Sequence, residues 1–427
     1  MMKRTARRTL LASAVAAALT APAAHATVGY FQHGYGDRAK AMGGAGIAYP
    51  QDAIAAATNP AGMVLVGDRM DFGTGIFRPV RDTDIVGNGS LGTVDYDPNN
   101  DQNFPLAHFG YNRMMSPNLS FGVSIYGNGG MNTSYEKPVL LFTTNPAAAQ
   151  GVDLMQLFVA PTVAWKFNDS HAFGVSLVLA YQRFKANGLD RFDNNTFSSA
   201  QGFVTNKGYD SSTGAGVRVG WIGQLTPRVS VGVTYATKTF MSEFDKYKGL
   251  FAEGGDFDIP ANYGIGFAFK ATDRTTVALD VMRILYSDVK SVGNPGINAF
   301  QAGQVGRLGA SNGMGFGWDD VTAVKIGVAH QYSSRLTLRA GFTHNTQPIP
   351  SSETLFNLLA PGVIENHVTL GATWKLNNGG ELTVSYFHAF NKEVNGSGSI
   401  PASFGGGEAN LAMYQDAIGI SYGMPIK

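Results

Sequence analysis

Apolar side chains alternate with small or polar ones along most of this chain. Between 119 and 125 every odd position is Leu, Phe, Val or Ile, and every even position is Ser or Gly. A period of two is typical of a β-strand with one apolar face. The pattern recurs at 173–180, 229–235, 336–343, 368–375 and 418–423. These repeats predict an all-β protein whose sheet has one oily face and one small or polar face.

Segment lengths favour a membrane barrel over a soluble β-sandwich, which also alternates. The patterned stretches 152–167 and 318–332 exceed ten residues, whereas sandwich strands have about five or six and tilted barrel strands need about 9 to 11. Short turns are expected near 116–118, 168–170, 226–227, 272–273, 333–334 and 377–380. Long loops are expected at 81–103, 127–151, 187–209, 241–256, 289–317, 347–362 and 391–410. Their strict alternation predicts a closed antiparallel barrel of about 14 strands.

Composition agrees with an exported membrane barrel. Charged residues are only 15% of the chain, glycines number 54, and cysteine is absent. After the first 26 residues no apolar run approaches 18, which excludes a helical membrane protein. The start itself is typical of a signal peptide, with cations up to Arg8, an apolar run from Leu10 to Leu19 and the small-x-small site Ala24-His25-Ala26. Removal of residues 1–26 lowers the formal charge from +1 to −3, so nothing suggests nucleic-acid binding.

The segment 27–66 precedes the patterned region 67–427 and is rich in small residues. We expect it to form a hatch that plugs the barrel. The run Ala53–Ala57 favours a short helix, and Pro60 ends it because proline disfavours helical geometry in the residue before it. Asn59 is then either a latch whose rearrangement opens a path or a structural cap, and the two roles are compatible.

In order and spacing, several short motifs resemble the FadL-type family of outer-membrane transporters of long-chain fatty acids and related hydrophobic compounds. They are Gly43-Gly44-Ala45-Gly46, Asn59-Pro60-Ala61, Tyr126-Gly127, Trp318-Asp319-Asp320, Thr337-Leu338-Arg339-Ala340-Gly341 and Asn366-His367-Val368-Thr369-Leu370-Gly371. The resemblance covers the whole mature chain. It implies a 14-stranded barrel with an N-terminal hatch, an internal hydrophobic pocket and a side exit beside a kink in the third strand.

Ligand-binding candidates follow from the resemblance and from unusual apolar positions. The family places its N-terminus at the pocket, which nominates Thr27, Val28, Tyr30 and Phe31, unless these simply fill the lumen. Apolar side chains on exposed loops need a reason. Two neighbouring loops carry such residues, Phe192, Phe197 and Phe203 on one and Phe244, Tyr247, Leu250 and Phe251 on the next. These side chains form either the core of a loop cap or a capture groove. The spacing of the residues on the second loop predicts one face of a short helix.

Head-group and gating candidates lie in the wall. Lys325 and Arg339 alternate with apolar neighbours, so they face the lumen, where they are candidates for binding a carboxylate or belong to an ordinary charged lining. Gly127, Gly129 and Gly130 follow the third strand and are poor strand formers. They predict either a local break in strand pairing or a loop that begins early. With Asn59, Pro60 and Ala61 they are our gating candidates.

These observations predict a channel rather than an enzyme. The chain has no GxSxG, HExxH or GxxxxGK[ST] motif, so we expect no catalytic site, cofactor or energy source. We expect passive uptake of long-chain fatty acids in the bacterial outer membrane by a monomer surrounded by lipid. Uptake of monoaromatic hydrocarbons of the toluene type is the alternative, and a general porin is the third.

Overall fold

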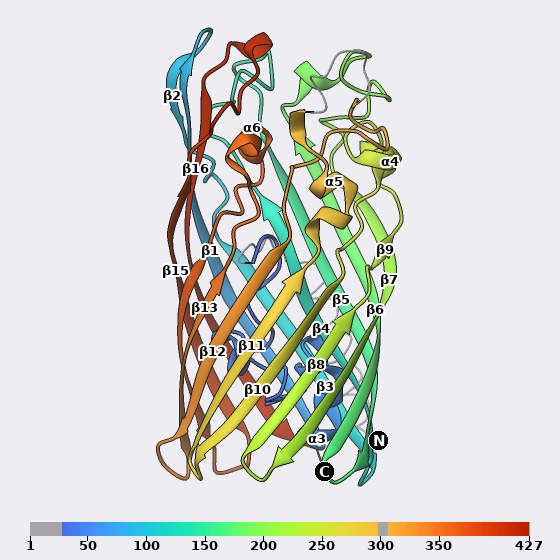
Figure 1. Ribbon diagram of the computed structural model, residues 1–427, viewed down its shortest axis with the longest axis vertical. Coiled ribbons are helices and arrows are strands. Elements are labelled where there is room, and N and C mark those ends of the chain that lie inside the picture. Colours follow the sequence, from blue (N-terminus) through green and yellow to red (C-terminus); the bar gives the residue numbers. More distant parts are fainter. Residues whose placement is uncertain (1–27, 298–305, 427) are drawn as a thin grey trace.

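The computed structural model describes residues 28–297 and 306–426. Fourteen strands form a closed antiparallel barrel, because the last strand pairs with the first (Figure 1). The barrel and its strand number are thus confirmed, and the sandwich alternative is wrong. The strands are β1 (Arg69–Asn88), β3 (Phe104–Ser116), β4 (Leu119–Asn132), β5 (Gly151–Asn168), β6 (His171–Asn187), β7 (Asp210–Thr226), β8 (Val229–Ala236), β10 (Asn262–Thr272), β11 (Thr275–Ile284), β12 (Val321–Gln331), β13 (Leu336–Asn345), β14 (Asn366–Lys375), β15 (Glu381–Val394) and β16 (Glu408–Pro425).

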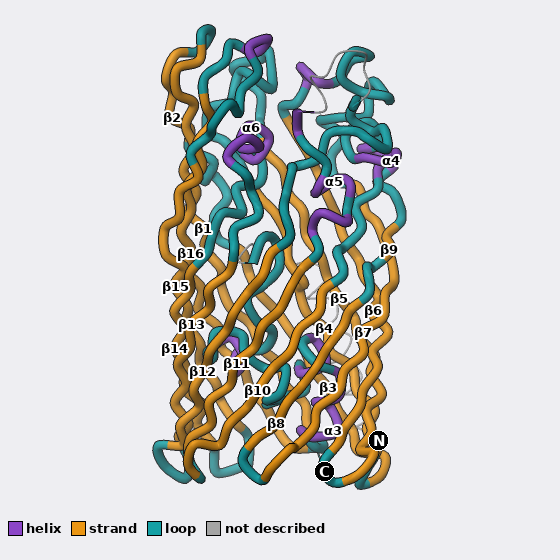
Figure 2. Tube along the Cα trace, viewed as in Figure 1, coloured by secondary structure: helices purple, strands orange, loops and turns teal. Residues whose placement is uncertain are grey.

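All six short turns lie where they were predicted, at one end of the barrel, and the long loops lie at the other (Figure 2). Several loop boundaries differ from expectation by a few residues. The first loop begins late, because residues 81–88 continue β1 and pair with β16 and with the short strand β2 (Gly92–Tyr96). Likewise β9 (Phe240–Met241) adds to β7. Backbone pairing therefore extends the wall beyond the apolar band that sequence patterning detects.

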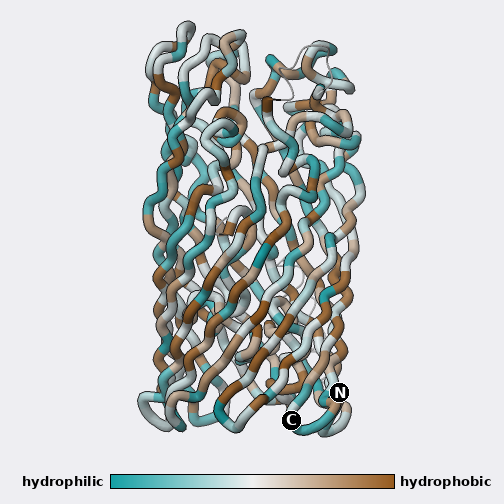
Figure 3. The backbone as a smooth tube through the Cα atoms, in the orientation of Figure 1, coloured by the Kyte–Doolittle hydropathy of each residue, from teal (hydrophilic) through white to brown (hydrophobic). Residues whose placement is uncertain are grey.

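The outer face of the wall is apolar. In β10, Ile265, Phe267 and Phe269 are exposed, while the residues between them face inward. Figure 3 shows brown and pale or teal positions alternating along the strands in the same way. This is the arrangement that hydrocarbon outside and a filled lumen inside require. Among the described helices, none has the length and apolar character needed to cross a membrane.

Residues 28–66, which we call the N-terminal segment, lie inside the barrel (Figure 1). It contains α2 (Asp37–Lys40), η1 (Ala55–Ala57), η2 (Pro60–Gly62) and α3 (Met63–Val66). The helix expected over Ala53–Ala57 is therefore shorter, a single 3-10 turn. Pro60 does more than end it, because it opens the next 3-10 turn as its first residue.

Wall glycines make room for this segment. At each of a set of inward-facing positions, an added Cβ would come within 3.0 Å of an atom of the N-terminal segment. We call this set the glycine belt: Gly73, Gly110, Gly122, Gly174, Gly220, Gly232, Gly266, Gly327, Gly341, Gly371 and Gly419. Because even a methyl group would collide, the segment is seated against the wall backbone itself.

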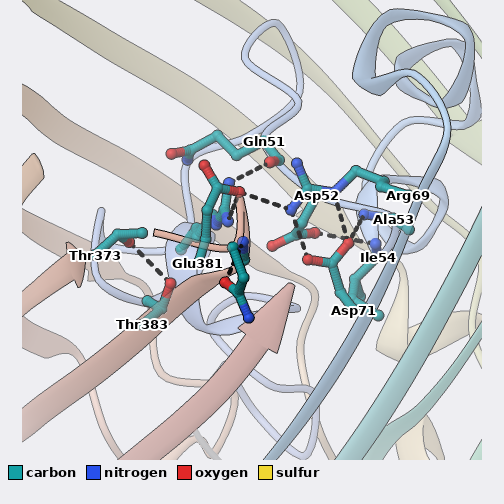
Figure 4. Close-up of polar contacts among 12 residues, drawn as sticks. Gln51, Asp52, Ala53, Ile54, Arg69, Asp71, Thr373, Glu381 and Thr383 are labelled. Carbon is teal, nitrogen blue, oxygen red and sulfur yellow. Dashed lines mark hydrogen bonds and ion pairs between the residues drawn. The ribbon is translucent and has the colours of Figure 1, made fainter. Parts of the chain in front are cut away.

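Buried charges hold the segment at the level of α2 (Figure 4). Arg69 of β1 makes a two-bonded ion pair with Asp71, at 2.7 Å for each bond, and also lies 3.3 Å from Glu381 of β15. Asp71 accepts from Ala53 N at 2.8 Å, and Glu381 pairs with Arg38 of α2 at 2.6 Å. Two-bonded arginine–carboxylate pairs fix orientation as well as distance. This network clamps the segment to both sides of the β1–β16 seam.

The long loops fold into a cap over the barrel. Its short helical elements are η3 (Asp190–Phe192), η4 (Asp245–Tyr247), α4 (Ala252–Gly255), η5 (Tyr286–Asp288), α5 (Lys290–Gly293), η7 (Ser351–Glu353), α6 (Thr354–Asn357) and η8 (Ala402–Phe404). The single helix expected over 244–251 is absent, because η4 covers only 245–247 and turns follow it. Its apolar side chains are nevertheless turned into the cap core.

Candidate functional site

A small apolar cavity of about 30 Å³ lies within the cap. We call it the cap cavity. None of the described residues that line it carries a charge, and only Ser291 brings a polar side chain: Val152, Phe184, Leu189, Phe192, Val204, Leu250, Phe251, Ser291, Leu308, Met314, Gly315, Phe316, Phe356 and Leu359. Such a lining binds apolar groups by burial and gives little orientation.

Three of the predicted loop residues line the cap cavity, namely Phe192, Leu250 and Phe251. Others support it from behind. The Phe244 ring lies 5.8 Å from the Phe251 ring, and the Phe197 ring lies 5.4 Å from that of Phe192.

Tyr247 braces the lining loop, because its hydroxyl accepts from Ala186 N and donates to Gly208 O. Phe203 is partly exposed, with Lys248 Nζ 4.1 Å from its ring centre. The structure thus bears out the loop-cap core, and the capture groove stays a prediction.

An acidic pair lies just behind Ser291. Ser291 Oγ donates to the backbone oxygen of Asp256 at 2.5 Å, and Lys238 Nζ lies 3.4 Å from the Asp258 carboxylate. Burial raises the pKa of Asp256 to about 7, and repulsion from Asp258 adds to the shift. Whether Asp256 carries a proton near neutral pH thus depends on how this cap loop packs around its carboxyl group.

The start of the N-terminal segment lies below the cap cavity. Val28, Tyr30 and Phe31 are buried, and Thr27 lies outside the described residues. The Phe257 ring lies 4.8 Å from that of Phe251 and 6.1 Å from that of Tyr30. Aromatic rings therefore lead without interruption from the cavity lining to the N-terminal segment.

Tyr286, which follows β11, holds this end of the segment. Its hydroxyl donates to Val28 O at 2.6 Å and accepts from the backbone nitrogens of Tyr30 at 3.1 Å and Phe31 at 3.3 Å. Its ring packs edge-on against those of Tyr30 and Trp318. The Tyr286 hydroxyl thus holds the backbone of Val28, Tyr30 and Phe31 in place.

The third barrel strand, β4, is broken at the predicted glycines. Pairing with β3 stops at His108 and Tyr126, although β4 continues to Asn132, and the register against β5 shifts between Gly127 and Gly129. The alternative of a loop beginning at 127 is therefore wrong. The free edge binds the N-terminal segment instead, because Gly130 N donates to Tyr30 O and Gln32 N donates to Asn128 O.

A second small cavity, of about 30 Å³, lies beside this break, and we call it the side cavity. Tyr126 and Gln156 reach it from the lumen face. Met155 and Leu157 belong to the other face of β5, the face that carries the exposed Val163. Residues of both faces of the wall therefore meet at the side cavity, which lies where β4 is no longer paired with β3.

Lys325 and Arg339 do not line either cavity. Lys325 Nζ donates to His33 O at 2.7 Å, and Arg339 donates to Gln51 at 2.9 Å and Thr373 at 2.6 Å. Both face the lumen, as alternation predicted, but they meet the N-terminal segment there. The head-group role expected for them has no support in this arrangement.

Asn59 acts as a cap and also reaches the wall. Its side-chain oxygen accepts from Ala61 N at 3.1 Å, and its amide donates to Ile47 O at 2.8 Å and Trp221 O at 3.1 Å. The belt glycine Gly220 leaves space for it. The capping interpretation is confirmed. The latch role requires Asn59 to move and stays a prediction.

A sequence profile described as outer membrane protein transport protein (OMPP1/FadL/TodX) matches residues 14–424. The chain belongs to this family. The resemblance noted in the sequence is therefore confirmed, and with it a place in the outer membrane of Gram-negative bacteria and a role in transport of hydrophobic compounds. By the usual polarity of such barrels, the cap faces outward and the short turns face the periplasm.

Solved structures of FadL/TodX-type proteins share the fold. The toluene transporter TodX of Pseudomonas putida has a TM-score of 0.67 at 17% identity, covering 92% of this chain and 99% of its own. A Pseudomonas aeruginosa FadL homologue gives 0.71 at 15%, covering 93% and 100%. The Ralstonia pickettii toluene transporter TbuX gives 0.63 at 18%, covering 92% and 99%. No curated protein sequence matches the chain significantly.

Sequence reasoning missed several residues of this FadL/TodX-type site. Phe184, Val204 and Phe356 line the cap cavity, and Tyr286 holds the N-terminal segment, yet none carries a local motif. Phe184 comes from β6 and the others from loops far apart in the chain, and they meet only in the folded cap. Within the described part of the chain, no cluster of three or more His, Asp or Glu residues could hold a metal ion.

Proposed function

We propose that this protein takes up hydrophobic compounds passively, from the cap cavity past the N-terminal segment and out through the side cavity into the membrane. The observation that carries the proposal is the side cavity, which is lined from both faces of the wall beside the broken β4. The N-terminal segment is the hatch in this scheme, because it pairs with the free edge of β4.

Two separate cavities suit transport better than one deep pocket. Burying a methylene group contributes about 0.8 kcal/mol, so a single site enclosing a whole aliphatic chain would retain it. Release then requires the ligand to pass between sites that each cover part of it. The path downward through the lumen is filled by the N-terminal segment, which is seated against the glycine belt, and this favours the sideways route.

The cap cavity favours apolar parts of a ligand and offers no charged group to bind a head group, because its described lining is uncharged. The chemistry of its lining does not distinguish a monoaromatic ring from the tail of a long-chain fatty acid. A fatty acid is favoured by Lys248, whose ammonium lies beside Phe203, next in sequence to the cavity residue Val204. We therefore propose long-chain fatty acids as ligands, with monoaromatic hydrocarbons as the second candidate.

Blocking each cavity in turn tests the route. We would measure initial uptake of labelled oleate and labelled toluene by cells that lack their own fatty acid channel. Val204→Trp fills the cap cavity, Ala107→Trp fills the side cavity, and Leu225→Trp on the exposed outer face is the matched control.

Both blocking variants should lose uptake while the control keeps it. Uptake of oleate alone or of toluene alone would assign the ligand class. Wild-type rates in Ala107→Trp would rule out the sideways route, and absence of selective uptake by the wild type would rule out the function itself.

A further inference from the structure

A buried lysine with no partner faces the side cavity. Lys40 is the last residue of α2 and lines this cavity, and its side chain is only 7% exposed. Its ammonium makes no hydrogen bond or ion pair with any residue that the structure describes. An unpaired buried charge is strongly unfavourable.

The other buried cations of the described chain are all engaged. Lys325 and Arg218 donate to backbone oxygens of the N-terminal segment, and Arg81 to loop carbonyls. Arg38 and Arg339 bond to side chains of the wall. Lys40 is the exception, and it is the one that lines the side cavity.

A second uncommitted donor lines the same cavity. The Tyr126 hydroxyl is buried and has no hydrogen-bond partner among the described residues. The amides nearby are already used, because Gln32 donates to Gly127 O and Gln156 is bonded between Asn128 and Gln182.

Asp37, three residues before Lys40 in α2, supplies a nearby negative charge but no ion pair to the ammonium. One of its oxygens accepts from Ser385 Oγ at 2.8 Å, and the other lies 3.8 Å from His108 Nε2 and makes no hydrogen bond with the described residues. The side-cavity donors that make no hydrogen bond with the described residues include the Lys40 ammonium and the Tyr126 phenol, a pair suited to a carboxylate.

We propose that Lys40 and Tyr126 form a carboxylate-binding subsite in the side cavity, which holds the head group of an aliphatic acid while its tail leaves between β3 and β4. Pro105, Ala107 and Leu157 supply the apolar exit for that tail. The proposal rests on the sideways route proposed above and assigns the head-group role to Lys40 of the N-terminal segment and Tyr126 of β4 instead of Lys325 and Arg339.

Matched ligands with the same tail test this subsite. We would reconstitute the full-length protein in lipid vesicles that contain albumin and measure initial uptake of palmitate and of methyl palmitate. The variants are Lys40→Met and Tyr126→Phe, which keep side-chain bulk, and the control is Lys375→Met, an exposed lysine at the turn end of β14. Heat-modifiable gel mobility verifies folding of each variant.

Lys40→Met should lower palmitate uptake about tenfold, the effect of losing a charge-assisted hydrogen bond, and leave methyl palmitate unchanged. Tyr126→Phe should act in the same direction. Equal loss for both ligands, or loss for neither, would overturn the subsite.

A second measurement separates this test from the transport route. The carboxyl resonance of ¹³C-labelled palmitate, bound to the protein in nanodiscs, should shift between wild type and Lys40→Met. No shift would overturn the subsite even if uptake occurs. Failure of the wild type to transport either ligand, with the shift present, would instead overturn the route alone.

Discussion

Replacing Tyr286 by phenylalanine should release the start of the N-terminal segment. The substitution keeps the ring that packs on Tyr30 and Trp318 and removes only the hydroxyl. Phe31 N and Val28 O each keep a hydrogen-bond partner, because Phe31 N also donates directly to Val28 O. Tyr30 N, in contrast, loses its acceptor in a buried position.

The size of the effect follows from these bonds. A buried donor left without a partner costs about 1–3 kcal/mol, and the lost bond to Val28 O contributes about 0.5–1.5 kcal/mol more. The released form should therefore gain about 2–4 kcal/mol relative to the docked form. Even the lower value raises the released population about thirtyfold, since about 1.4 kcal/mol is tenfold.

The chain contains no cysteine, so a single thiol can report this release. Val28 is fully buried, and in a Val28→Cys background the rate of maleimide labelling should follow the released fraction. Tyr135→Phe is the matched control, because its buried hydroxyl also donates to a backbone oxygen, Leu358 O at 2.6 Å, away from the segment. Labelling of Tyr286→Phe within threefold of the control would refute the reasoning.

Three further changes probe the segment and the cap. Asn59→Ala removes a cap and its bonds to Ile47 and Trp221, so we expect about 1–2 kcal/mol lower stability and a lower thermal midpoint by calorimetry. Gly341→Ala should push Gly43 off the wall, seen as leakage of a hydrophilic dye that wild type excludes. Asp256 has a raised pKa of about 7, so the cap should lose protection in hydrogen exchange as pH rises from about 4 to 7, and Asp256→Asn should flatten that dependence. An unchanged midpoint, no leak, or the same slope would each contradict the corresponding prediction.

The wall could be predicted because lipid imposes a simple rule on it. Alternation between 119 and 125 gives the strand and its faces, and turn chemistry such as Ser116-Pro117-Asn118 gives the end of the hairpin. The same rule placed Lys325 on the lumen side. Alternation says nothing about what fills the lumen at that height. It therefore could not show that Lys325 Nζ already donates a hydrogen bond to His33 O.

The candidate site was less predictable because its parts are joined by loops and by the N-terminal segment. Phe192 and Phe251 stood out as apolar residues on loops, but Phe356 looked ordinary and is their neighbour across the cavity. Lys40 gave no signal, since a lysine near an aspartate in a short polar stretch reads as a solvated surface. Its isolation appears only when the segment is folded inside the barrel.

The contacts of the glycine belt also depend on the circumference of the barrel. Strand number and stagger together set the diameter of a closed sheet. Only a ring of this width brings glycines from opposite strands against one inner segment, as Gly174 lies against Pro60 and Gly371 against Ala41. Adding or deleting one hairpin would leave the inner chain without its seat, so the contents of this barrel specify how many strands enclose them.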